Sequence, residues 1–159
     1  NVKDHRGNPI DPPSVRRHLG VFFERHTEEL DPVAGAAAAL ASLSERAQVV
    51  VLSNIPLPQR DARRRALKRH GMDYPMIANE GTKGPAVEEL IRRAQAPAVF
   101  LDDIPHNHTS VREHAEDVYR LHFVADTRLA RLIPPAEHSH ARADTWPEAQ
   151  PLIEAHLFG

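Results

Sequence analysis

The sequence predicts an α/β fold, a three-layer Rossmann-like core with a mainly parallel sheet. Two short apolar runs, residues 49–52 and 98–101, are typical of strands that are buried on both faces. Between them, a segment that opens at Gly84-Pro85 has apolar residues at regular helical spacing. Strands that alternate with helices favour parallel pairing, because each helix returns the chain to the same end of the sheet.

Weaker patterns complete the order of elements. A polar, turn-rich stretch at 1–13 precedes the first helix, and residues 134–144 are expected to form a loop. Further strands are expected at residues 74–78 and 119–124. Further helices are expected at residues 14–30, 31–43, 59–70 and 109–115, after Asp126, and after the capping box of Thr145 and Glu148.

Length and composition limit the class of protein. The chain has 159 residues, which suits one domain: a hairpin and at most a small helical cap in 1–30, and the core in 31–159. The net charge of -2 argues against a dedicated nucleic-acid binder. No apolar run could span a bilayer, and the absence of cysteine fits a reducing cytoplasm. The Arg-, Ala- and Pro-rich composition is typical of a GC-rich bacterial genome.

Polar side chains follow the two main strands. Ser53-Asn54 comes after the first apolar run, and Asp102-Asp103 comes after the second, with Asn107 a little further on. Lys83 stands just before the intervening helix. Ligands of open α/β sheets bind where parallel strands end, so these groups are expected to share one edge. A lysine and a hydroxyl suit a phosphoryl group, and carboxylates suit Mg²⁺.

These segments resemble the second, third and fourth motifs of the HAD (haloacid-dehalogenase-like) hydrolase superfamily, in family order, over residues 33–125. The resemblance implies Mg²⁺-dependent hydrolysis of a phosphorylated small molecule through an aspartyl-phosphate. It further implies that Ser53 and Asn54 bind the phosphoryl oxygens and that Lys83 neutralises their charge. Asp102 and Asp103 would hold the Mg²⁺ ion.

The first motif of that superfamily is an Asp-x-Asp at the end of a hydrophobic strand, and it supplies the nucleophile and the acid/base. The nearest match is Asp4-His5-Arg6-Gly7-Asn8, in which Arg6 replaces the acid/base. Three interpretations stay open. The motif lies upstream of Asn1; it has degenerated and left a catalytically impaired binding or regulatory module; or the chain is another α/β protein.

The expected position of the first strand bears on these three interpretations. In the HAD fold this strand lies between the strands that end at Ser53 and Asp102. Without it, two inner strands would leave buried backbone groups unpaired, at roughly 1–3 kcal/mol for each group. Some segment must therefore fill the position, either residues before Asn1 or the tail Asn1–Asp4.

The histidines and the basic segment have simpler interpretations. The pairs His106/His108 and His138/His140 lie in predicted loops, where surface histidines are expected; His106, beside the acidic pair, is a candidate substrate contact. The basic residues of 59–70 favour a solvated helix face, although they could also attract a polyanion.

Overall fold

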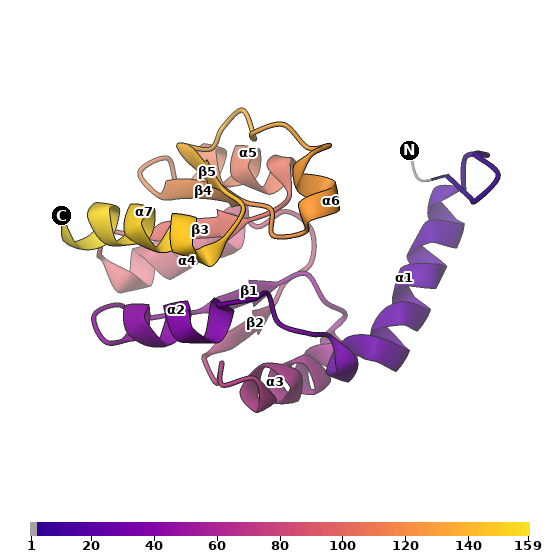
Figure 1. Cartoon of the computed structure of the whole chain (residues 1–159), viewed down its shortest axis with the longest axis horizontal. Coiled ribbons are helices and arrows are strands. Elements are labelled where there is room, and N and C mark those ends of the chain that lie inside the picture. Colours follow the sequence, from indigo (N-terminus) through magenta and orange to yellow (C-terminus); the bar gives the residue numbers. More distant parts are fainter. Residues whose placement is uncertain (1–2) are drawn as a thin grey trace.

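The computed structural model describes residues 3–159 and has an α/β fold with two short parallel sheets (Figure 1). The smaller sheet pairs β1 (Val51–Ser53) with β2 (Met76–Ala78). The larger sheet has the order β3 (Val99–Asp102), β4 (Tyr119–Phe123), β5 (Ala141–Ala143). All of these pairs are parallel, so the predicted fold class is confirmed.

Helices connect the strands, as the alternation predicted. They are α1 (Pro12–His26), α2 (Ala36–Ser44), α3 (Arg60–Arg69), α4 (Gly84–Ala94), α5 (Pro105–His114), α6 (Thr127–Ala130) and α7 (Trp146–Phe158). The predicted Asp126 cap and the capping box of α7 are both present. Two starts differ from the prediction: α1 begins at Pro12, capped by Asp11, before the expected start at residue 14, and α5 begins at Pro105, before the expected start at residue 109.

Strand β5 corrects the expectation of a loop over 134–144. Ala141 and Ala143 pair with Leu121 and Phe123 of β4. The strand has three residues with Arg142 at its centre, so it carries no apolar pattern that a sequence could reveal. Its conformation follows from pairing with β4, which is a tertiary effect.

Two apolar clusters cover opposite faces of the strands. In β3, Leu101 packs against one cluster and Phe100 belongs to the other; in β1, Val51 packs against the first and Leu52 against the second. The first cluster is built largely by α2 and α7, with Leu43, Trp146 and Ile153, and the second by α4 and α5, with Val87 and Val111. Both sheets therefore lie between the same two helix layers, which gives the three-layer arrangement.

Strand pairing does not join the two sheets within residues 3–159. Among residues 3–159, β1 is hydrogen-bonded only to β2, and β3 only to β4. The facing edges of β1 and β3 are therefore unpaired. Lys3 forms an antiparallel bridge with Pro9 in a turn before α1, away from the sheets (Figure 1). Lys3 and Asp4 thus do not extend a central strand, and Asn1 and Val2 lie outside the described residues.

Helix α1 projects from the body, and its residues are not buried (Figure 1). It is joined to the core through the 3-10 turn η1 (Thr27–Glu29). Glu28 of this turn accepts hydrogen bonds from Arg65 and Arg69 of α3, so part of the basic segment forms ion pairs. Over residues 3–159, no helix has both the length and the apolar character needed to cross a bilayer.

Candidate functional site

A buried ion pair lies where β3 ends and α4 begins. Lys83 Nζ donates to Asp102 Oδ2 at 2.6 Å, and the two side chains are 13% and 3% exposed. Lys83 is the residue that precedes the first turn of α4, and Asp102 is the last residue of β3. The expected meeting of these two residues at the carboxyl edge is therefore observed.

The second carboxylate oxygen of Asp102 is also held. Asp102 Oδ1 accepts from the backbone N–H of Ile104 at 2.8 Å and from Asn107 Nδ2 at 2.9 Å. Asn107 is fully buried, so this candidate acts by orienting Asp102. Three donors thus hold this carboxylate in a single orientation.

Hydrogen bonds connect the end of β1 to the loop that carries Lys83. Asn54 Nδ2 donates to the carbonyl of Gly81 at 2.8 Å, and Asn54 Oδ1 accepts from Asn79 Nδ2 at 2.8 Å. The backbone N–H of Asn79 donates to the carbonyl of Ser53 at 2.9 Å. The oxygen and the nitrogen of the Asn54 side-chain amide are therefore both engaged within this loop.

Gly84 explains how Lys83 reaches Asp102. The backbone N–H of Gly84 donates to Ser110 Oγ of α5 at 3.1 Å. A Cβ at position 84 would overlap the Ser110 carbonyl and would lie 2.6 Å from His114 Nδ1. Only glycine lets the start of α4 approach α5 this closely, and that approach sets the position of Lys83.

The second aspartate of the pair is accessible. The side chains of Asp103 and His106 are exposed, and His106 lies in the first turn of α5. No group of three or more possible metal-ligating side chains occurs within 3–159. Mg²⁺ commonly takes only one or two protein carboxylates and completes its shell with water. Asp103 is accessible to such an ion, whereas both oxygens of the buried Asp102 carboxylate are already bonded, to Lys83, Ile104 and Asn107.

His108 and His122 correct the sequence-based expectation about histidines. Both are fully buried, although His108 was expected on the surface and His122 was not singled out. His108 is buried because α5 starts early and turns this residue inward, while His106 stays exposed. Burial lowers the pKa of His108, an effect only partly offset by its hydrogen bond to Asp102.

Asp4 lies apart from this site. Its carboxylate accepts from the backbone N–H groups of Arg6 and Asn8, both at 2.8 Å. These bonds, with those from Asn8 contributing most, lower the pKa of Asp4. Asp4 therefore closes the turn before α1 and does not supply a carboxylate to the edge of the sheets.

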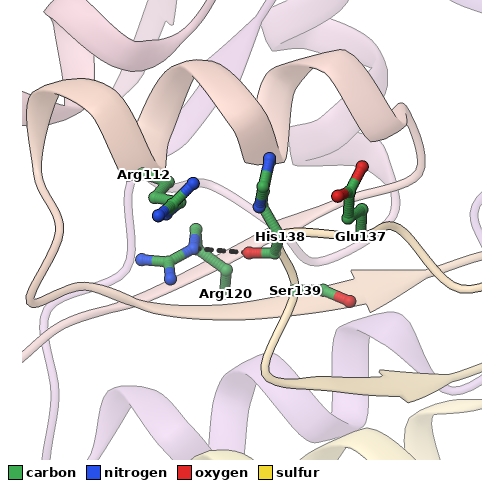
Figure 2. A pocket seen from close by; sticks show the side chains of 5 residues that line it. All are labelled: Arg112, Arg120, Glu137, His138 and Ser139. Carbon is green, nitrogen blue, oxygen red and sulfur yellow. Dashed lines mark hydrogen bonds between the residues drawn. The ribbon is translucent and has the colours of Figure 1, made fainter.

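A surface hollow of about 500 Å³ is lined by residues outside the candidate site (Figure 2): Arg112, Arg120, Glu137, His138 and Ser139. Arg120 Nε donates to the His138 carbonyl at 2.7 Å, and Nη1 donates to the carbonyls of Glu116 and Val118, both at 2.8 Å. Most donors of Arg120 are thus used to hold neighbouring loops, which indicates a structural role.

Comparisons with protein-family models, curated proteins and solved structures gave no match. The identification of the candidate site therefore depends on the geometry of Ser53, Lys83, Asp102 and Asp103.

Proposed function

We propose that this chain is the core of a HAD-type phosphohydrolase, which hydrolyses phosphate monoesters of small molecules with Mg²⁺ through an aspartyl-phosphate. The buried pair of Lys83 and Asp102 at the carboxyl edge is the observation that carries the proposal. Ser53 ends the neighbouring strand and is linked to the loop that carries Lys83. Ligands of open parallel sheets bind at this edge.

Each side chain has a defined task in this proposal. The Lys83 ammonium stabilises negative charge on the phosphoryl oxygens, and the Ser53 hydroxyl donates a hydrogen bond to them. Asp102 and Asp103 would hold a Mg²⁺ ion, Asp102 by exchanging its bond to Lys83 for the metal, and the ion would neutralise charge on the same phosphoryl group. Asn107 and the N–H of Ile104 keep the Asp102 carboxylate in place.

The proposal assigns the nucleophilic aspartate to a strand between β1 and β3, formed by chain N-terminal to Asn1. The unpaired edges of β1 and β3 support it, because an open inner edge presents a row of unbonded N–H and C=O groups. Each such buried group costs roughly 1–3 kcal/mol, against about 5–15 kcal/mol for the stability of a whole domain. A strand parallel to its neighbours would end beside Ser53 and Asp102.

A second candidate function is a binding or regulatory module that holds a phosphoryl group without turnover. It is favoured by the position of Asp4, which lies in the turn before α1 and not at the sheet edge. In that case Lys83 and Ser53 anchor the phosphoryl group, and hydrolysis is absent.

Hydrolysis of p-nitrophenyl phosphate with Mg²⁺ distinguishes the two functions. The assay uses the full-length protein. We expect Lys83→Met to lower kcat on the order of 100- to 1,000-fold. Lys68→Met, which removes an exposed lysine paired with Asp73, is the matched control and should keep full activity. Binding of Mg²⁺ and phosphate without turnover would support the module, and absence of both would reject both functions.

A further inference from the structure

Two guanidinium groups in the surface hollow have no carboxylate partner. Arg112 is exposed on α5, whereas Arg120 of β4 is only 6% exposed. Figure 2 shows both guanidinium groups at one side of the hollow and the Glu137 carboxylate at the other. Within residues 3–159, no ion pair includes Arg112, Arg120 or Glu137. The hollow therefore presents two positive charges that this part of the chain does not pair.

The two arginines repel each other. Burial lowers the pKa of Arg120, and the nearby positive charge of Arg112 lowers it further. The carboxylate of Glu116 offsets only part of this effect. An anion bound beside both guanidinium groups would offset the cost of burial and the repulsion together.

One nitrogen of the Arg120 guanidinium has no acceptor. Its Nε and Nη1 atoms donate to backbone carbonyls, whereas Nη2 lies 3.3 Å from His140 Nε2. The backbone N–H of Arg120 donates to His140 Nδ1 at 3.0 Å, so the neutral ring carries its proton on Nε2. Burial, Arg120 and His156 lower the pKa of His140, which favours this neutral ring. Nη2 and Nε2 are therefore both donors, and Arg120 Nη2 is left without an acceptor among the described residues.

A structural role accounts for only part of the Arg120 side chain. The bonds from Nε and Nη1 hold the neighbouring loops. A water molecule would accept from Nη2 but would leave the charges of Arg112 and Arg120 unpaired. A free donor on a buried cation, next to a second cation, is the arrangement that an anionic ligand completes.

The charges of the lining favour a singly charged ligand. Arg112, Arg120 and Glu137 together leave one positive charge. The Ser139 hydroxyl adds no donor, because it already donates to the Ala136 carbonyl at 2.7 Å. A phosphate dianion would bring a second negative charge towards Glu137. A carboxylate neutralises the single charge, and its two oxygens match the planar donor edge of a guanidinium group.

We propose that this hollow binds the carboxylate group of a small molecule, which accepts hydrogen bonds from Arg112 and from Arg120 Nη2. None of the residues that line the hollow belongs to the candidate site at Lys83 and Asp102. The inference is therefore independent of the proposed phosphohydrolase function.

NMR titration of the full-length protein with sodium acetate tests the inference, with acetate exchanged for chloride at constant ionic strength. We expect saturable shifts of the Arg120 side-chain N–H signals and of the Ser139 amide signal. Arg112→Gln should weaken acetate binding about 10-fold, as the loss of a charge-assisted hydrogen bond predicts. Glu137→Gln should strengthen it about 2- to 5-fold, because the variant removes the negative charge of the lining.

Arg64→Gln is the matched control, since it removes an exposed arginine of α3 and should keep wild-type affinity. Arg112 and Glu137 are also exposed, so these variants should keep the fold, which the amide spectrum of each variant checks. Absence of saturable shifts, or equal acetate affinity for wild type and Arg112→Gln, would overturn the inference.

Two further measurements separate the parts of the inference. A titration with phosphate without Mg²⁺ tests the ligand class: saturable shifts at the hollow with phosphate and none with acetate would contradict a carboxylate site. In ¹⁵N-histidine-labelled wild type, His140 should show an Nε2–H signal. An Nδ1–H form of His140 would give Arg120 Nη2 an acceptor and would remove the basis of the site.

Discussion

Lys83 Nζ lies 2.6 Å from Asp102 Oδ2, and this contact joins the start of α4 to the end of β3 inside the protein. The Asp102 side chain is almost fully buried, and its carboxylate is bonded by this cation and by the donors Ile104 N and Asn107 Nδ2. The same contact fixes the lysine on which the proposed phosphate site depends.

Lys83→Met should destabilise the fold, because it leaves the buried Asp102 carboxylate without its counter-ion. The expected loss is about 3–5 kcal/mol in the free energy of unfolding, measured by urea denaturation. The double variant Lys83→Met/Asp102→Asn should recover part of this loss. Lys68→Met should leave stability nearly unchanged, and an equal effect of the two single variants would refute the role of the buried pair.

Gly84→Ala should separate α4 from α5, because the added methyl group overlaps the Ser110 carbonyl. We expect a loss of about 1–3 kcal/mol in the free energy of unfolding, the usual cost of overpacking. Gly20→Ala is the matched control, since a Cβ there meets no atom within 4 Å and alanine favours the helix. Equal free energies of unfolding for the two variants would show that the close approach of α4 to α5 at Gly84 does not contribute to stability.

The stability of the protein should fall as the pH drops below about 6.5. His108 has a lowered pKa in the folded state, so the unfolded chain binds its proton first, near the ordinary pKa of about 6.5. His108 therefore contributes its full stabilisation of the fold above a pH of about 6.5. This stabilisation is lost as the pH falls toward the pKa that His108 has in the folded state. His140, whose pKa burial also lowers, contributes in the same direction.

His108→Gln tests this pH dependence, because glutamine cannot be protonated in this range. Unfolding free energies measured from pH 7.5 to pH 5 should fall less steeply for the variant than for wild type. Equal slopes would show that His108 is not the source of the pH dependence.

Arg120→Lys should destabilise the turn at residues 116–118 and the loop that contains His138. A single ammonium cannot replace the bonds to the carbonyls of Glu116 and Val118 and the bond to the carbonyl of His138, the last of which Figure 2 shows. Each carbonyl left without a donor costs roughly 1–3 kcal/mol. Arg112→Lys, at an exposed position on the same hollow, is the control, and similar melting temperatures for both variants would refute the prediction.

The sequence predicted the elements that carry a strong local signal. The apolar runs at 49–52 and 98–101, the spacing of α4 and the capping box of α7 each depend on neighbours in the chain, and all four elements are present. β5 has no such signal, because three residues around Arg142 become a strand only by pairing with β4.

The candidate site was likewise predictable only in part. That Lys83 and Asp102 meet follows from the rule that parallel strands end at one edge, so sequence position was sufficient. The engagement of Asn54 in its own loop and the burial of His108 and His122 depend on contacts between distant segments. His122 lies between Leu121 and Phe123 in an expected strand, and this polar residue between two apolar neighbours was the available signal.

Calorimetric titration of the full-length protein with inorganic phosphate in the presence of Mg²⁺ tests the central claim most directly, because it measures binding at this edge separately from turnover. Wild type and Lys68→Met should bind phosphate with the same affinity, whereas Lys83→Met should lose most of it. Folding of each variant is checked by circular dichroism at the same temperature. Phosphate binding by folded Lys83→Met with wild-type affinity would contradict a phosphoryl site at the edge formed by Lys83 and Asp102.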